Sequence, residues 1–443
     1  MQTDTERASS LSESISEGGA GNGAILAKYI SERMDAAIAC IQPASMTRVG
    51  VAVSGGGDST ALLMLLSRWS RENGVELLAA SVDHGLRPEA QKEIDDVRFL
   101  AESLGHKHST LRWNPGRARG NLQDAARRAR YGLLKKWAAG IGASSVALGH
   151  TADDQAETFV LRLARGSGVD GLACMSEASL RRGIWWLRPL LGIRRQELRD
   201  YLNSIEVPWS EDPSNENPAF DRIKVRQALR TFESAGLSVP RLAATASRMR
   251  MAREVLQASA TRCARKECSV NGIGDLVFSA EIWKLEEETR YRILAQAAMF
   301  LAGHQYRPRF RSLHRVIGAV AAGRRATLSG CLFECSDDGG VLIGREPAFC
   351  EGPVAPGAVW DRRWRMERVD GEAFGMVERL GEAGLARCPR WKASGFRKSS
   401  LVASPSVWNR GELVSAPKAG SANGWRATLL AGKDEFLASL EGH

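Results

Sequence analysis

The chain lacks any run of the roughly 20 apolar residues that a membrane-spanning helix requires. Residues 1–23 are polar and acidic, so they have neither the basic segment and apolar core of a secretory signal nor the character of a mitochondrial presequence. We therefore expect a cytoplasmic protein that does not enter a membrane, in which residues 1–25 form a disordered tail.

Paired cysteines are also missing. The sequence has eight cysteines, but none belongs to a C-x-x-C pair, and no histidine lies at zinc-ligand spacing beside them. This pattern predicts free, buried thiols rather than a zinc site.

Acidic residues are in deficit. The net charge is +10, and residues 211–330 carry 20 Lys and Arg against 12 Asp and Glu. A basic segment of this kind favours a polyanionic partner. An ordinary arginine-rich surface would have the same charge, so composition leaves both interpretations open.

The stretch VAVSGGGDSTALLMLLSRW, residues 51–69, has a glycine-rich turn between an apolar strand and an apolar helix, but it lacks the lysine of the common phosphate-binding loop. Its candidate phosphate-binding residues are Ser54, Gly55, Gly56, Gly57, Asp58 and Ser59. Glycines allow close backbone approach, and a helix N-terminus directs N–H groups at an anion. We expect Asp58 to hold Mg²⁺ or to orient the loop. A plain strand-to-helix turn is the alternative.

Strand and helix patterns alternate from residue 47 onward, which predicts an α/β fold with a doubly wound parallel sheet. The alternation ends at the polar, proline-containing segment 207–222. The pattern is then helical to about residue 320, and short strand-like runs follow. We expect a disordered tail and three domains: a phosphate-binding domain over residues 26–215, a helical domain over residues 216–322, and a small mixed or β-rich region over residues 323–443.

A second group of polar residues, in GHTADDQAET, follows the fourth expected strand. Asp153, Asp154 and Glu157 occupy the start of a helix, and the last two share a face. This helix begins at the carboxyl end of a strand, where doubly wound folds bind ligands. His150 precedes the acids, and His84 ends the second strand in the same way, so either is a candidate proton carrier or a structural histidine. Acids in a first turn also complement the helix dipole, which leaves a structural role open.

Together with further motifs, the loop resembles a known family. S-G-G-x-D-S is typical of the PP-loop of N-type ATP pyrophosphatases, which split ATP into AMP and pyrophosphate. The stretches SVDHGLRPEA, AARRARYGLL, LGHTADDQAETFVLRLARGSGVDGL and WSEDPSN follow in the order and spacing of tRNA(Ile)-lysidine synthetases. The resemblance covers residues 47–230 and, more weakly, residues 300–347.

The resemblance implies an ATP- and Mg²⁺-dependent ligase. Such an enzyme adenylates the C2 oxygen of the wobble cytidine (position 34) of tRNA(Ile) with a CAU anticodon. The ε-amine of free L-lysine then displaces AMP and gives lysidine, which changes decoding from AUG to AUA. The implied roles are ATP binding by the loop, catalysis by Asp58 and His150, lysine or Mg²⁺ binding by Asp153, Asp154 and Glu157, and tRNA binding by Arg127, Arg130, Arg222 and Arg226.

One position departs from the family pattern, because Ile223 stands where an asparagine usually follows the first arginine of R-N-x-x-R. Two rival functions also stay open. A tRNA 2-thiolase of the same superfamily would need positioned, reactive cysteines, and only Cys174 lies near the expected site motifs. A non-catalytic tRNA-binding protein would keep the fold without the chemistry, although the intact Asp58 and DDQAET helix argue against this.

Overall fold

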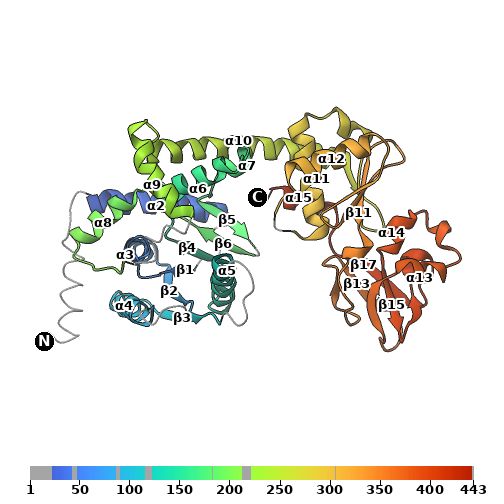
Figure 1. Cartoon of the computed structure of the whole chain (residues 1–443). Coiled ribbons are helices and arrows are strands. Elements are labelled where there is room, and N and C mark those ends of the chain that lie inside the picture. Colours follow the sequence, from blue (N-terminus) through green and yellow to red (C-terminus); the bar gives the residue numbers. More distant parts are fainter. Residues whose placement is uncertain are drawn as a thin grey trace. The chain divides into compact units, whose positions relative to one another are not determined.

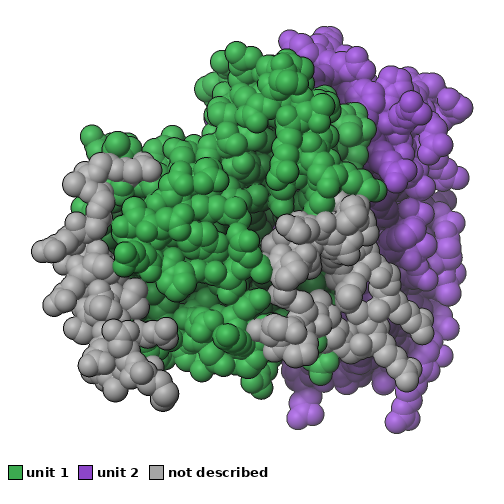
Figure 2. Space-filling model, turned by 60° about the vertical axis from the view of Figure 1, so that its left-hand side comes forward, with its two compact units in different colours: residues 1–253 green, residues 254–443 purple. Residues whose placement is uncertain are grey.

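The computed structural model describes residues 22–41, 47–85, 90–114, 122–181, 183–211, 221–304 and 306–441. The chain forms two compact units, residues 1–253 and residues 254–443, which Figure 2 colours separately. Parts of the predicted features lie outside the described residues, namely residues 1–21 of the tail, 86–89 of SVDHGLRPEA and 212–215 of WSEDPSN. Within the described ranges, no helix has the length and apolar character needed to span a bilayer.

Unit 1 is built around a six-stranded sheet with the order β3-β2-β1-β4-β6-β5. The strands are β1 (Arg48–Ala52), β2 (Glu76–Asp83), β3 (His108–Arg112), β4 (Ser145–Leu148), β5 (Ala178–Arg181) and β6 (Ile184–Leu187). Neighbouring strands are parallel except for the edge pair β5 and β6, which is antiparallel. The predicted doubly wound α/β fold is therefore confirmed.

Helices cover both faces of this sheet (Figure 1). The helices of unit 1 are α2 (Asn22–Ile41), α3 (Gly57–Asn73), α4 (Ala90–Ser103), α5 (Leu122–Gly140), α6 (Ala152–Ala164), α7 (Val169–Leu172), α8 (Arg195–Ser204), α9 (Asp221–Ser234) and the first part of α10 (Val239–Glu267). One apolar core joins α2, α3, α4 and α8 to the strands, and a second joins α5 to the opposite face. Because both faces are buried, the central strands are almost continuously apolar, as in VGVAV.

The strand order reverses between β1 and β4, which lie side by side with Ala52 paired to Leu148. Doubly wound sheets bind ligands at the carboxyl ends of the strands that flank such a reversal. The glycine-rich loop follows β1, and the GHTADDQAET segment follows β4. The topology therefore brings the two predicted site segments together.

A smaller apolar cluster holds α6 against α7, α9 and the start of α10. It includes Ala156 and Phe159 of α6, Leu229 of α9, and Leu242 and Ala246 of α10. This packing fixes α9 beside the acidic helix α6, although the two helices are separated by more than 50 residues of chain.

Unit 2 contains three antiparallel sheets, with the orders β7-β8-β11-β10-β9, β12-β13-β17 and β14-β15-β16. The strands are β7 (Cys268–Val270), β8 (Leu276–Phe278), β9 (Ala326–Leu328), β10 (Cys331–Cys335), β11 (Val341–Arg345), β12 (Val359–Trp360), β13 (Trp364–Arg368), β14 (Met376–Arg379), β15 (Pro405–Asn409), β16 (Glu412–Ser415) and β17 (Trp425–Leu429). The helices are α11 (Glu287–Ala302), α12 (Phe310–Ala321), α13 (Gly381–Ala386), α14 (Lys398–Val402) and α15 (Lys433–Glu441). The expected helices followed by a β-containing C-terminal region are confirmed.

One local expectation was wrong, because the segment expected to be helical from 222 to about 320 contains the hairpin of β7 and β8. Asn271 forms its turn, since its side-chain oxygen accepts from the backbone N–H of Ile273 at 3.1 Å and of Asp275 at 2.9 Å. Strands of three residues are too short to show a period of two, so the helical pattern on either side concealed them.

Candidate active site

The glycine-rich loop is closed by its own hydroxyl groups. Gly55 has φ +87°, a left-handed conformation that favours glycine. The Ser59 hydroxyl accepts from the backbone N–H of Ser54 at 3.0 Å and donates to the carbonyl of Gly56 at 3.0 Å, and the Thr60 hydroxyl donates to the carbonyl of Gly55 at 3.3 Å. Ser59 and Thr60 therefore shape the loop, while the exposed Ser54 and the first N–H groups of α3 face outward from it.

The second segment approaches the loop at Gly149. A Cβ atom at this position would lie 3.1 Å from the Cα of Ser59 and 3.2 Å from the carbonyl carbon of Asp58. A side chain at this position would crowd the backbone at the start of α3, so glycine favours the close approach of the two segments. The acids of α6 are thereby positioned next to the phosphate-binding loop.

Two of the three acids of α6 cap helices. One oxygen of Asp154 accepts from the backbone N–H of Thr151 at 2.9 Å and from its hydroxyl at 3.0 Å, which completes a capping box. Asp153 accepts from the backbone N–H of Arg195 at 2.8 Å and from the side chain of Arg194 at 3.3 Å, so it caps α8. Asp153 and Asp154 therefore have a structural role as helix caps, the alternative that their sequence positions left open.

Glu157 is the acid with unused bonding capacity. Its side chain is 1% exposed, and its Oε1 accepts from Nε of Arg226 at 2.7 Å. Its Oε2 is buried and has no hydrogen-bond partner among the described residues. A buried carboxylate oxygen without a donor is costly, so this atom marks a place for a ligand donor.

Arg195 joins the loop to the acids. Its Nε donates to Asp58 at 2.9 Å, and its Nη2 donates to Asp154 at 3.4 Å. Burial raises the pKa of Asp58, and this effect exceeds the lowering by the adjacent Arg195 guanidinium. Burial alone would lower the pKa of Arg195, but the carboxylates of Asp58 and Asp154 raise it above its ordinary value. Arg195 therefore remains charged in this position.

His150 lies close enough to Asp154 and to three arginines for their charges to act on it. Its Nδ1 is buried without a hydrogen-bond partner among the described residues. Burial lowers its pKa to about 3, against the opposing effect of Asp154 and with help from Arg188, Arg130 and Arg127. The imidazole is therefore neutral at pH 7. It suits a hydrogen bond to a substrate better than a role as a proton donor.

The comparisons with known proteins bear on this geometry. A family model described as a PP-loop domain matches residues 30–232, a range that holds every predicted site residue. The tRNA(Ile)-lysidine synthase of Ruegeria pomeroyi is 43% identical over 407 residues, which cover 89% of this chain and 94% of that protein. The chain belongs to the tRNA(Ile)-lysidine synthase family. The predicted class of enzyme, an ATP-dependent ligase of tRNA modification with a PP-loop domain, is confirmed.

Other relatives give the same family at lower identity. The tRNA(Ile)-lysidine synthase of Rhizobium meliloti is 33% identical over 81% of this chain and 82% of that protein, and that of Wolbachia pipientis is 37% identical over 72% and 76%. A solved structure of a U34-tRNA thiolase, NcsA from Methanococcus maripaludis, is 19% identical, covers 51% of this chain and 78% of its own, and has a TM-score of 0.43.

The thiolase alternative finds no support in the cysteines of unit 1. Cys174 is the unit's cysteine with a described side chain, and it is buried and free. Burial raises the pKa of its thiol to about 11, whereas a sulfur-transferring cysteine needs a thiolate near neutral pH. The protonated thiol of Cys174 does not favour sulfur transfer, which is consistent with membership of the lysidine synthase family.

The predicted arginines lie around the same site. Arg130 and Arg127 of α5 are close enough to affect His150, and Arg127 lies 5.8 Å from the centroid of the Tyr131 ring. Arg222 acts on Asp154, and Arg226 binds Glu157 directly. The expected tRNA contacts of these arginines stay predictions, but α9 also supplies cations to the acids, which the sequence analysis did not foresee.

Sequence reasoning missed Arg194, Arg195 and Arg188. The first two had a signal, because cations at the start of a helix oppose the helix dipole and need another reason to be there. Arg188 is 4% exposed and donates to the carbonyl of Ser176 at 2.9 Å. The second predicted histidine, His84, packs edge-on against Trp113 and lies beside Arg130.

Magnesium was expected at Asp58. Among the described residues, no three or more His, Cys, Asp or Glu side chains gather to hold a metal by themselves. Mg²⁺ is commonly held by one or two carboxylates together with substrate phosphates, so a carboxylate at the phosphate-binding loop fits that mode. One oxygen of Asp58 is committed to Arg195.

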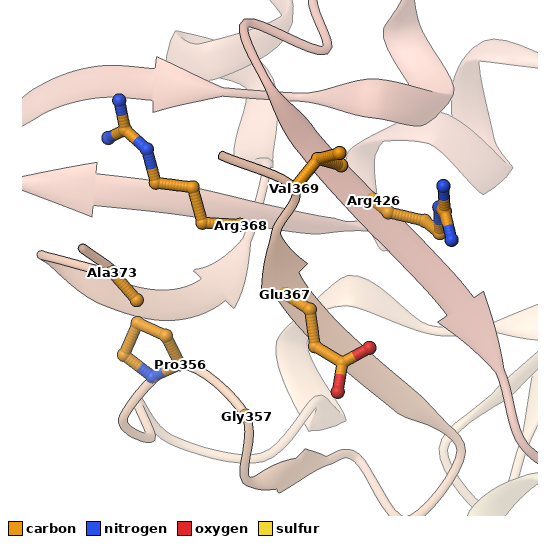
Figure 3. Close-up of a pocket in the computed structure, with 7 residues that line it drawn as sticks. All are labelled: Pro356, Gly357, Glu367, Arg368, Val369, Ala373 and Arg426. Carbon is orange, nitrogen blue, oxygen red and sulfur yellow. The ribbon is translucent and has the colours of Figure 1, made fainter. Parts of the chain in front are cut away.

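A pocket of about 460 Å³ lies in unit 2 (Figure 3). Its lining residues are Pro356, Gly357, Glu367, Arg368, Val369, Ala373 and Arg426. The guanidinium of Arg368 lies 4.9 Å from the centroid of the Phe374 ring and 6.0 Å from that of Trp425, and its Nε donates to the carbonyl of Asp370 at 2.6 Å. None of the predicted site residues lines this pocket. The candidate active site is assigned to unit 1 from the chemistry of its residues and not from the size of a cavity.

Proposed function

We propose that the chain attaches free L-lysine to C2 of the wobble cytidine of a tRNA(Ile) with a CAU anticodon, in the cytoplasm. The observation that carries this proposal is the position of Glu157. Its buried, unpartnered Oε2 lies in a cluster of carboxylates that Arg195 ties to the phosphate-binding loop. A site for an ammonium group beside a site for a polyphosphate is what a lysine-joining, ATP-dependent ligase needs.

In the first step, the C2 oxygen of the cytidine attacks the α-phosphorus of ATP and pyrophosphate leaves. The loop N–H groups hold the departing pyrophosphate, because they lie at the N-terminus of α3. Asp58 would hold Mg²⁺ together with the phosphates, and the ion would neutralise part of the charge of the polyphosphate. The neutral His150, with Arg127 and Arg130 beside it, is available for hydrogen bonds to the nucleotide.

In the second step, the ε-nitrogen of lysine attacks C2. The C2–N bond forms, the C2–O bond breaks, and the oxygen leaves with AMP. The ammonium must lose a proton before its nitrogen can attack. Glu157 and Oδ1 of Asp154, the oxygen that the capping box does not use, orient the amine, and Glu157 is the proton acceptor because its Oε2 has no other donor.

Incubation with radiolabelled lysine, ATP and total tRNA tests the proposal. Label should appear in the tRNA(Ile) with a CAU anticodon and in no methionine tRNA, with one pyrophosphate released per lysine. Asp58→Ala should abolish pyrophosphate release while the melting curve stays that of a folded protein. Sulfur incorporation, or tRNA binding with no pyrophosphate release, would overturn the proposal in favour of one of its two rivals.

A further inference from the structure

Arg195 touches all four carboxylates of the site, yet the two chemical steps give it no task. Its Nε lies 2.9 Å from Asp58, whereas its Nη2 and Nη1 lie 3.4 Å from Asp154 and 3.7 Å from Glu157. Its backbone N–H donates to Asp153. The contact with the loop acid is short, and the contacts with the two acids of α6 are long.

The side chain of Arg195 is held by these charges rather than by its helix. It is the first residue of α8, where the helix dipole disfavours a cation. It is also 23% exposed, so it has space to change rotamer. Its position therefore depends on which charges surround it.

The free site is close to electrical balance. Its four carboxylates belong to Asp58, Asp153, Asp154 and Glu157, and the cations that act on them are Arg194, Arg195, Arg222 and Arg226. A lysine ammonium beside α6 adds positive charge, and a polyphosphate at the loop adds negative charge. The two ligands attract each other directly, and a cation that moves from the acids toward the phosphates would strengthen the binding of both.

We propose that Arg195 is this cation. In the free enzyme its guanidinium lies beside Oδ1 of Asp154 and Oε1 of Glu157; when ATP binds, it turns toward the phosphates while staying on Asp58, and this leaves the negative charge of both carboxylates to the lysine ammonium that binds at Oε2 of Glu157. The inference rests on the proposed function, since it needs ATP at the loop and lysine at α6. Arg195 is then a positioning residue that couples the two substrates, so ATP and lysine raise each other's affinity by the same factor.

Equilibrium dialysis of labelled lysine against the full chain tests the coupling. Both arms contain tRNA(Ile), and one also contains α,β-methylene-ATP, which cannot release pyrophosphate. In the wild type, the analogue should lower the Kd of lysine by about fivefold or more, the usual range of such couplings. In Arg195→Gln, the Kd should be the same in both arms.

Arg199→Gln is the matched control, because Arg199 lies on the same helix α8 and pairs with Glu211 instead of an acid of the site. It should keep the wild-type ratio of the two Kd values. If Arg195→Gln does not fold, Arg195→Lys keeps the charge without the fork and should show a reduced ratio. An equal Kd in both wild-type arms, or a wild-type ratio in Arg195→Gln, would overturn the inference. Failure of the proposed function would appear separately, as no lysine joined to tRNA by the wild type.

Discussion

At the scale of single residues, the acids of α6 differ in how much the fold already uses them. Asp153 caps α8 and Asp154 caps α6, but Glu157 keeps one buried oxygen without a partner. A substitution of Glu157 therefore reports on ligand binding more cleanly than a substitution of either neighbour.

Glu157→Gln should raise the lysine KM of lysidine formation by about tenfold or more, because a neutral amide replaces a buried, charged partner of the ammonium, and it should also lower kcat because the amide cannot accept the proton. The affinity for ATP should change little. Asp154→Asn should raise the lysine KM too, but it should also lower stability by about 1 kcal/mol, since it weakens the cap at Thr151. Steady-state kinetics with melting curves separate the two effects, and an unchanged lysine KM in Glu157→Gln would remove this residue from the lysine site.

His150 predicts a dependence of stability on pH. Its pKa is lowered to about 3 in the folded state, so between roughly pH 6.5 and pH 3 the unfolded chain binds a proton here that the folded chain does not. Stability must then fall as the pH falls through this window, by at most about 1.4 kcal/mol per pH unit for one proton. In His150→Gln, the free energy of unfolding should decline less steeply between pH 7 and pH 5. Equal slopes in denaturant titrations of both proteins would contradict the buried, neutral histidine.

The acids, the histidine and the loop could be predicted because each lies in one short stretch beside a strand end. Their partners could not, because Arg195 is 137 residues from Asp58 and Arg226 is 69 residues from Glu157. Local pattern says nothing about such distances. The fold brings these residues together only through the strand reversal at β1 and β4 and the packing of α6 on α9.

At the scale of elements, α9 supplies arginines to the acids, and the same arginines are the predicted tRNA contacts. If Arg222 and Arg226 both contact tRNA phosphates, replacing both with alanine should reduce the log–log salt slope of tRNA binding by about two contacts of 0.7–0.9 each. Cognate and non-cognate tRNA should weaken alike, since phosphates carry no sequence information. Binding titrations at several salt concentrations measure this.

The ion pair with Glu157 sharpens the experiment. If Arg226 binds Glu157 and no tRNA phosphate, the salt slope of the double variant should fall by the value of only one contact. Arg226→Ala by itself should then raise the lysine KM. ATP affinity should stay the same in each variant. An unchanged salt slope combined with a lower melting temperature would mean that both arginines are structural.

The alternating elements of unit 1 were predictable because a parallel sheet buried on both faces produces apolar strands and amphipathic helices in turn. The hairpin of β7 and β8 was not, because strands of three residues carry no periodic signal. The edge strand β5 was also beyond prediction, since the alternation in its ASLR sequence extends over only four residues. Long, regular elements reveal themselves in sequence, whereas short ones depend on tertiary partners.

At the scale of the whole molecule, the two compact units have separate apolar cores. All predicted site residues, from Ser54 to Arg226, belong to unit 1. Calorimetry should therefore resolve two unfolding transitions. α,β-Methylene-ATP should raise the transition temperature of unit 1 alone, because at a hundredfold excess over its Kd it adds about 2.7 kcal/mol to the free energy of unfolding of that unit. Movement of both transitions together would show that the units unfold cooperatively.

The central claim is that ATP activates the cytidine oxygen and that lysine replaces this oxygen. The most direct measurement uses tRNA(Ile) with ¹⁸O at the C2 oxygen of the wobble cytidine, incubated with the chain, ATP and lysine. Because the C2–O bond breaks when the C2–N bond forms, mass spectrometry should find the ¹⁸O in AMP and none in the modified nucleoside. Unlabelled AMP, with the ¹⁸O retained in the tRNA, would contradict the account.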